Sequence, residues 1–337
     1  MHSLEVLPFI KSPKKIKILD IRTKEAFMDG HIPDAIHLPF PIQLKKLRKQ
    51  FGSGAPMGDV KSFIQDYEEW KVTIKPYLSM DTPSYIYCQS GGLRSFYFSE
   101  LWNTYRTQLY FLEKGYEGYC HFQQGFFEKL QFPELYVLSG WTGSGKTALL
   151  EALKAKGRQV VNLSGLANHR GSVFGRNEKF GQPTSTQFSH QLFGLCRNFD
   201  PSQAIFTEAE GPFIGTVHLP KPIYTLLQNA KIIHLEIPKT ARVLHLMEEY
   251  AHLDKAMILQ GLQKIQSRLS PKDYEQALTY LEKGNRKALV TLLISYYDHS
   301  ALYRVYASKS SIKLHFSRVD IDEMIKAIEE QASLLPN

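Results

Sequence analysis

The sequence has little cysteine, and what it has is scattered. Cys88, Cys120 and Cys196 lie far apart, without the paired spacing of a zinc site. Because the number is odd, a disulfide framework is also disfavoured, and we expect reduced thiols. No run of about 18 apolar residues and no apolar leader with a small-residue cleavage site is present, which argues against a membrane span and a secretory signal. These absences predict a cytoplasmic protein without a membrane partner.

Internal repeats and low-complexity tracts are missing as well. The 337 residues are 43% hydrophobic and 22% charged, which is typical of a chain with two or three globular domains. The formal net charge of +8 is spread almost evenly and is not gathered in a basic tail. Such a surface suits a polyanionic partner such as RNA, but a solvated surface with a mild charge excess explains the charge equally well.

One glycine-rich stretch matches the phosphate-binding loop pattern: Gly140-Trp141-Thr142-Gly143-Ser144-Gly145-Lys146-Thr147. It lies between a predicted strand at 135–138 and a predicted helix at 146–156 that ends at Gly157. In such a loop the backbone N–H groups turn toward phosphate oxygens, Lys146 supplies positive charge, and the Thr147 hydroxyl is placed to bind Mg²⁺. The stretch therefore predicts a phosphate site, without indicating which phosphate compound it binds.

Acidic residues follow one of the later apolar segments. Strands are predicted at 160–163, 204–207 and 232–235, and Glu208 and Glu210 come directly after the second. Carboxylates at the end of a parallel strand are placed to hold a metal or accept a proton, whereas the alternative is a pair of solvated loop charges. The segment between the first two of these strands contains Asn168, His169 and Arg170, which we expect to form a supporting polar loop.

The first third of the chain has a cysteine on a second glycine-rich loop. Strands predicted at 16–21 and 85–87 alternate with helices at 23–29 and 94–105, which indicates an α/β domain. Cys88 begins the loop Cys88-Gln89-Ser90-Gly91-Gly92-Leu93-Arg94-Ser95. A helix N-terminus and Arg94 would stabilise a thiolate that carries sulfur or selenium or attacks phosphate, and the alternative is a buried, inert thiol. We expect Cys120 and Cys196 to be structural.

The pattern divides the chain into three parts. Residues 1–130 and 131–237 are expected to form two α/β domains, the second with a parallel sheet. Residues 238–337 have helical periodicity, and Ser270-Pro271-Lys272-Asp273 predicts a capped helix start.

These motifs together resemble a known enzyme family. Asp20-Ile21-Arg22, Glu25, the segment Gly30-His31-Ile32-Pro33-Asp34-Ala35 and the Cys88 loop resemble a rhodanese domain. Joined to the phosphate loop and Ala167-Asn168-His169-Arg170-Gly171-Ser172, they resemble the tRNA 2-selenouridine synthases. Glu208-x-Glu210, Arg242-Val243 and Tyr296-Tyr297-Asp298 extend the resemblance over nearly the whole chain.

The resemblance implies two reactions on the wobble 2-thiouridine of tRNA. The phosphate loop would seat the diphosphate of geranyl diphosphate while the tRNA sulfur displaces it. Cys88 and Arg94 would then serve the replacement of that sulfur by selenium from selenophosphate. The family relationship implies no tightly bound cofactor, an enzyme that supplies selenophosphate, and a tRNA surface on the helical tail that includes Arg268, Arg286, Lys287 and Arg304.

The chain departs from the family pattern at two places. Where the family usually has Cys-Trp-Arg-Gly-Gly-Met-Arg-Ser, this chain has Gln89 and Ser90 after the cysteine. Where the family commonly continues Ser-Arg after the second glutamate, this chain has Gly211 and Pro212.

Other functions agree with parts of the same pattern. The phosphate loop alone would also suit a nucleoside-triphosphate-dependent kinase or hydrolase with a rhodanese-type regulatory domain. The Cys88 loop alone would suit a persulfide carrier or a phosphatase.

Overall fold

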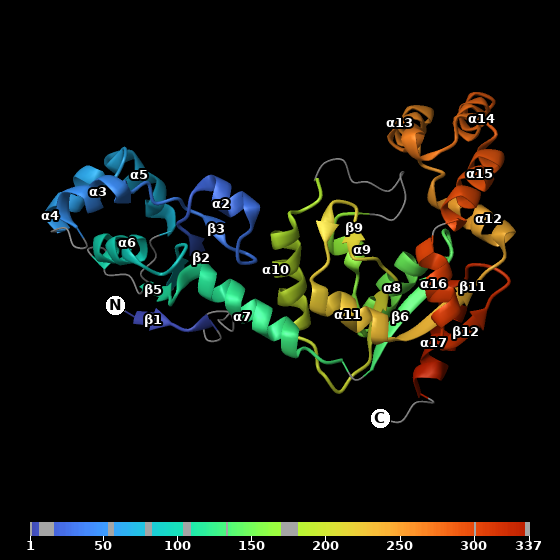
Figure 1. Ribbon diagram of the computed structural model, residues 1–337, viewed down its shortest axis with the longest axis horizontal. Coiled ribbons are helices and arrows are strands. Elements are labelled where there is room, and N and C mark those ends of the chain that lie inside the picture. The colour runs from blue at the N-terminus through green and yellow to red at the C-terminus, as the bar shows by residue number, and fades with distance from the viewer. Residues whose placement is uncertain are drawn as a thin grey trace. The chain divides into compact units, whose positions relative to one another are not determined.

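The computed structural model describes residues 2–6, 17–52, 57–77, 83–103, 109–132, 134–169, 181–299 and 301–333. The chain forms two compact units, Met1–Lys129 and Leu130–Asn337, each built on its own five-stranded sheet (Figure 1). In the described ranges, no helix combines the length and the apolar character needed to cross a membrane.

The sheet of the first unit is parallel throughout. Its strands lie in the order β1 (His2–Leu4), β5 (Leu109–Leu112), β4 (Ser84–Tyr87), β2 (Lys17–Asp20) and β3 (Ile36–His37). In the described residues of this unit, the α-helices are α2 (Lys24–Asp29), α3 (Leu44–Phe51), α4 (Met57–Val60), α5 (Tyr67–Ile74), α6 (Leu93–Asn103) and α7 (Gly115–Lys129). The α/β prediction for this part of the chain is confirmed, and α2 begins after Thr23, whose hydroxyl caps it by accepting from the Ala26 N–H.

The second unit also has a parallel sheet. Its strands lie in the order β12 (Ile312–His315), β11 (Lys231–Glu236), β6 (Leu135–Gly140), β8 (Ile205–Glu208) and β7 (Gln159–Val161). A short hairpin is added by β9 (Phe213–Ile214) and β10 (Val217–His218). The helices before the tail are α8 (Lys146–Ala155), α9 (Leu163–Leu166), α10 (Ser185–Cys196) and α11 (Lys221–Asn229).

One predicted strand is shorter than its apolar run. The run at 160–163 continues through Leu163, but β7 stops at Val161 because Asn162 caps α9, its side-chain oxygen accepting from the Gly165 N–H at 2.6 Å. Polar capping therefore overrides hydrophobic continuity at this point.

The last hundred residues are mostly helical, as predicted. They contain α12 (Lys239–Glu249), α13 (Lys255–Ile265), α14 (Pro271–Glu282), α15 (Arg286–Asp298), α16 (Ala301–Lys309) and α17 (Ile321–Ser333). Ser270 caps α14 as expected, because its hydroxyl accepts from the Asp273 N–H. The helices α13, α14 and α15 enclose a core of their own, which includes Leu262, Leu281 and Leu293 (Figure 1).

The boundary expected at residue 237 does not separate two domains. β12 pairs with β11, and α17 packs on α8, so both ends of the 131–337 segment share one core. The sequence pattern missed β12 because this edge strand has only four residues, of which Ile312 and Leu314 pack on the core, so its alternation is too short to stand out. The tail is thus part of the phosphate-loop unit and does not form a third body.

This sharing of one core predicts a stability effect of a tail residue on the phosphate-loop sheet. Ile328 lies fully buried on α17, and Ile328→Ala should cost about 2–5 kcal/mol by leaving a cavity. Hydrogen–deuterium exchange of peptides from β6 and α8 should therefore accelerate. Lys326→Ala on the exposed face of the same helix is the matched control and should leave exchange unchanged. Equal protection of β6 and α8 in the two variants would contradict the shared core.

Candidate functional site

The phosphate loop joins β6 to α8 and is packed on both sides. Gly143 and Gly145 have φ values of +81° and +76°, a region that side chains disfavour. A Cβ on Gly143 would lie 2.9 Å from Cγ of Leu246 on α12, and one on Gly145 would lie 2.7 Å from Cγ1 of Val319. The two glycines thus let the loop turn while it contacts the helical tail.

Lys146 lies folded back over this loop. Its Nζ donates to the Gly140 carbonyl at 2.7 Å and to the Ser144 hydroxyl at 3.3 Å. Burial lowers the pKa of Lys146 to about 8, although Glu208 and Glu210 oppose this shift. An anion at the loop would restore the preference for the ammonium form, which is the arrangement expected of a phosphate seat. Thr147 follows in the first turn of α8 and is exposed.

The two carboxylates are brought to the same place by Ser164. Its backbone N–H donates to Glu208 Oε1 at 2.7 Å, and its hydroxyl donates to Glu210 Oε1 at 3.1 Å. Burial raises the pKa of both, that of Glu210 to about 7, and the like charge of Glu208 adds to the shift at Glu210. Glu208 is 4% exposed and Glu210 is half-buried, and both carboxylates bond to Ser164, so neither is a fully solvated loop charge.

The Asn-His segment supports this serine. The His169 N–H donates to the Ser164 carbonyl at 2.8 Å, and Asn168 Nδ2 donates to the Gly181 carbonyl at 3.1 Å. Gln182 Nε2 donates to the Ala167 carbonyl at 3.0 Å. Asn168 and Gln182 therefore link the two sides of the 170–180 segment, and Arg170 lies outside the described residues.

Arg242 and Asp298 are the site residues whose roles the sequence did not show. The Arg242 guanidinium donates to the Thr142 carbonyl at 2.8 Å and makes a two-bond pair with Asp298 at 3.0 and 2.8 Å. In the sequence, Arg242 and Asp298 stand out only as parts of the family pattern. Their separation of 56 positions offers no local signal of the contact.

Cys88 begins its loop at the end of β4, and Arg94 lies in the first turn of α6. The Cys88 carbonyl accepts from the Tyr116 N–H at 2.9 Å, so the start of α7 holds the loop. The Cys88 side chain is 3% exposed, which makes it more buried than expected of a loop thiol. Burial lowers the pKa of Arg94, whereas the interaction with Cys88 raises it.

The Asp20-Ile21-Arg22 motif has a structural role next to this loop. Arg22 donates through Nε and Nη2 to the Asp20 carboxylate and lies 3.7 Å from the centre of the Tyr116 ring. Since Tyr116 also bonds to the Cys88 backbone, this ion pair fixes the position of the loop.

The phosphate-loop site offers oxygen donors to a metal ion. Within the described ranges, no three His, Cys, Asp or Glu side chains form a cluster typical of a metal site. Thr147, Glu208 and Glu210 offer a hydroxyl and carboxylates, which is the donor chemistry that Mg²⁺ prefers.

The raised pKa of Glu210 predicts how stability changes with pH. A carboxyl whose pKa rises on folding favours the folded state while it is protonated, and this contribution is lost as pH rises from its unfolded value of 4.5 through about 7. Glu210→Gln removes that loss. The free energy of unfolding of the variant, relative to the wild type, should therefore increase by on the order of 2 kcal/mol between about pH 5 and pH 8.

Urea unfolding followed by circular dichroism measures this difference. Glu151→Gln, an exposed glutamate on α8, is the matched control and should show no such trend. A difference between Glu210→Gln and wild type that stays constant with pH would contradict a raised pKa.

Comparison with known proteins agrees with this arrangement. The family model of the tRNA 2-selenouridine synthase AAA domain matches residues 133–334, and that of the rhodanese-like domain matches residues 7–121. A tRNA 2-selenouridine synthase of Shewanella sp. strain ANA-3 is 28% identical over 351 aligned positions, covering 91% of this chain and 94% of that protein. The one from Sulfurovum sp. strain NBC37-1 is 28% identical and covers 92% and 94%. The one from Shewanella oneidensis is 29% identical and covers 86% of each. Since the first model spans more than half of the chain and includes the phosphate loop, Glu208, Glu210 and the Arg242–Asp298 pair, this protein belongs to the tRNA 2-selenouridine synthase family.

Proposed function

We propose that this protein replaces the sulfur of wobble 2-thiouridine in tRNA with selenium, by way of an S-geranylated intermediate. The observation that supports it best is the phosphate loop of the family-matched unit, where Lys146 lies over the loop and interacts electrostatically with Glu208 and Glu210. A loop of this kind stabilises a leaving diphosphate, and it does so for any attached group.

The first half-reaction uses this loop. The thiocarbonyl sulfur of the tRNA attacks the allylic carbon of geranyl diphosphate, a carbon–sulfur bond forms, and the carbon–oxygen bond to diphosphate breaks. The base releases its N3 proton to solvent, so the S-geranylated base is neutral. Lys146 moves from the Gly140 carbonyl to the diphosphate, and the backbone N–H groups of Gly143 and Gly145 donate to its other oxygens. Thr147 and Glu208 are the ligands available to a Mg²⁺ that would neutralise the same leaving group.

The protonated form of Glu210 suits this chemistry. Its pKa of about 7 leaves a large share of the side chain neutral near physiological pH, so that it does not repel an incoming diphosphate as a carboxylate would. Ser164 positions Glu210 through its hydroxyl and Glu208 through its backbone, which keeps both beside Lys146.

The second half-reaction uses the first unit. The selenium of selenophosphate forms a bond to the same carbon of the base, the carbon–sulfur bond there breaks, and the sulfur leaves as geranylthiol. Water then cleaves the selenium–phosphorus bond and phosphate is released. Cys88 and Arg94 serve selenium delivery, with the Arg94 cation steadying the anionic donor. Selenophosphate is made by a separate supply enzyme.

The departures from the family pattern change the surroundings of both sites. Gln89 Nε2 donates to Glu117 Oε1 at 3.2 Å, so this substituted side chain binds to α7 and offers no cation to the donor. After Glu210, the Pro212 carbonyl accepts from the Leu219 N–H at 3.0 Å, and the Glu210 carbonyl accepts from the Tyr306 hydroxyl at 2.9 Å. The segment that lacks the arginine is thus held by hydrogen bonds to its neighbours.

One observation favours a nucleoside-triphosphate hydrolase as the second candidate. Glu208 ends β8, the strand beside β6, which is where such enzymes place the acidic residue that organises Mg²⁺ and water. Steady hydrolysis of ATP without change to thiolated tRNA would favour this candidate over the transferase.

Lys146→Ala should abolish the first half-reaction, because the diphosphate loses its one lysine partner in the loop. We expect geranylation of 2-thiouridine tRNA to fall by at least about 100-fold, as when a main electrostatic donor is removed from an enzyme site. Nucleoside mass spectrometry after incubation with geranyl diphosphate measures it. Lys154→Ala, an exposed lysine on the same helix, is the control and should retain full activity. Geranylation by Lys146→Ala at the wild-type rate would exclude the phosphate loop from this step.

Cys88→Ser should separate the two half-reactions. It leaves the phosphate loop intact, so geranylated tRNA should accumulate at the normal rate, while conversion to selenouridine with selenophosphate should be lost. Cys120→Ser, the same change at a half-buried cysteine of α7, should affect neither step. Full selenation by Cys88→Ser would remove the role given to this thiol.

A further inference from the structure

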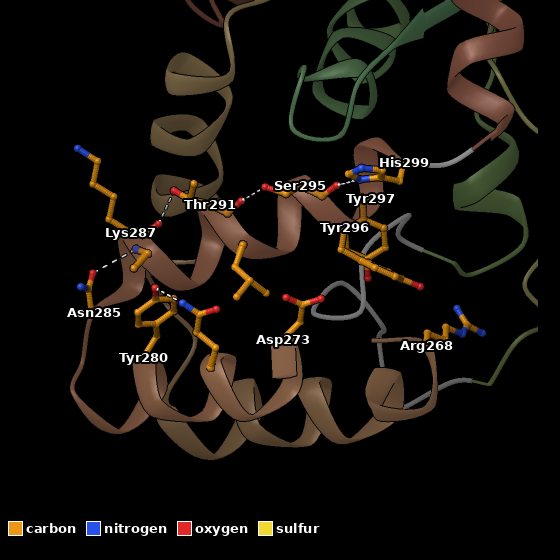
Figure 2. A pocket seen from close by; sticks show the side chains of 13 residues that line it. Arg268, Asp273, Tyr280, Asn285, Lys287, Thr291, Ser295, Tyr296, Tyr297 and His299 are labelled. Atoms are coloured by element: carbon orange, nitrogen blue, oxygen red, sulfur yellow. Dashed lines mark hydrogen bonds between the residues drawn. The ribbon is translucent and has the colours of Figure 1, made fainter. Parts of the chain in front are cut away.

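The helical tail contains a large cavity that the proposed chemistry does not use. It has a volume of about 1200 Å³ and opens between α14 and α15 (Figure 2). Its lining consists of tyrosines, amides, hydroxyls and a few charged groups: Arg268, Asp273, Gln276, Tyr280, Asn285, Lys287, Ala288, Thr291, Leu292, Ser295, Tyr296, Tyr297 and His299. A pocket for a drug-sized ligand has about 300–1,000 Å³, so this one has room for a larger or segmented ligand.

Aromatic rings and cations occur at both ends of the cavity. Figure 2 shows Tyr296, Tyr297 and Arg268 at one end and Tyr280 with Lys287 at the other. The rings of Tyr296 and Tyr297 are nearly perpendicular, with centroids 5.1 Å apart, so they present faces in two directions. Flat faces beside cations are the combination that binds unpaired nucleotides, with stacking on the base and charge for the phosphate.

Several polar groups of the lining are already held in place. The Tyr280 hydroxyl accepts from Gln276 Nε2 at 2.7 Å, and the Ser295 hydroxyl accepts from Lys239 Nζ at 2.5 Å. Asp273, the acidic member, accepts from the Ser270 hydroxyl at 2.7 Å as part of the α14 cap. Helices that fix the lining in this way form a site with little ordering left to be done on binding.

The basic side chains of the helical tail differ in their surroundings. Arg286, expected as part of a tRNA surface, donates to the carbonyls of Ala251 and Leu253 and so braces the helices. Arg268 and Lys287 are exposed at the cavity. The side chain of Arg304 lies outside the described residues.

One end of the cavity is connected to the phosphate loop through Asp298 and Arg242. Tyr297 and His299 flank Asp298, whose carboxylate pairs with Arg242, and Arg242 donates to the Thr142 carbonyl of the loop. A nucleotide bound at Tyr296 and Tyr297 would therefore lie a short chain of contacts away from the diphosphate seat.

We propose that this cavity binds unpaired nucleotides of the tRNA anticodon loop, with a base stacked at Tyr296 and backbone phosphates at Arg268. The inference rests on the proposed function, since it names where the same substrate is held. Single-stranded bases fit because their faces are open to stacking, whereas bases in a duplex are covered by their neighbours.

The test measures binding alone. The probe is a fluorescein-labelled anticodon stem–loop RNA with unmodified uridine, titrated with the full chain and no geranyl diphosphate, and fluorescence anisotropy reports affinity. Tyr296→Leu should weaken binding about tenfold, and Tyr296→Phe, which keeps the ring, should restore it. Arg268→Ala should weaken binding and reduce the slope of log affinity against log salt by about 0.7.

Matched controls separate the cavity from general charge. Lys283→Ala removes one exposed cation just after α14 but outside the cavity, and it should bind as the wild type does. A fully paired RNA of equal length should bind more weakly than the stem–loop. Because Arg268 is exposed, Arg268→Ala tests the proposal even where Tyr296→Leu disturbs the helices.

The outcomes distinguish this inference from the proposed function. Wild-type affinity of both Arg268→Ala and Tyr296→Leu, equal binding of paired RNA, or no binding of the stem–loop by the wild type would overturn the cavity assignment. Loss of binding in both variants supports it. A wild type that binds the stem–loop through the cavity but never geranylates thiolated tRNA would refute the proposed function and leave the cavity assignment standing.

Discussion

A single buried guanidinium joins the phosphate loop of this protein to its helical tail. Arg242 is 4% exposed and is satisfied on three sides, by the Ile237 carbonyl, the Thr142 carbonyl and the carboxylate of Asp298. Breaking a buried ion pair costs about 3–5 kcal/mol, because the remaining charge is left without a partner. The position of the phosphate loop, the start of α12 and the end of α15 are therefore set by one interaction.

The same constraint explains why the tail belongs to the phosphate-loop unit. The side chains of Leu246 and Val319 pack against Gly143 and Gly145, respectively. The backbone of the loop therefore cannot change conformation without a movement of α12 or of the segment before α17. β12 completes the sheet on one side and α17 covers α8. Fixed surroundings of this kind suit a phosphate-binding loop, since donors that are already oriented lose little on binding.

Burial shifts the pKa values of the ionisable groups beside the phosphate loop. Lys146 is destabilised as a cation and Glu210 as an anion, and each partly offsets the other. Both shifts favour the binding of an anion at the phosphate loop. The Lys146 ammonium gains a partner from the anion, and a protonated Glu210 does not repel it. Ser164 holds this balance by donating to both carboxylates from the cap region of α9.

Much of this was accessible from local sequence patterns. The phosphate loop, the Ser270 cap, the strand before Glu208 and the loop after β4 each depend on residues within a few positions of one another, and all were predicted. The same patterns predicted a strand that extends beyond the end of β7, and they did not predict β12. Neither a helix cap nor a short edge strand leaves a strong hydrophobic signal in the sequence. The patterns also divided residues 131–337 in two, since the change from strand to helix periodicity does not reveal that a later strand returns to the sheet.

What the sequence determined by itself is therefore the chemistry: a phosphate loop, an acidic pair, a cysteine loop and the family to which they point. The tertiary structure alone decided which of these groups meet. Ser164 reaches Glu208 across 44 positions, Arg242 reaches Thr142 across 100, and Cys88 became buried through packing. Local patterns record the conformational preferences of neighbouring residues, whereas these contacts form only when distant segments pack against each other. That packing removes the water that would otherwise solvate each charge, so each charge needs a partner within the protein.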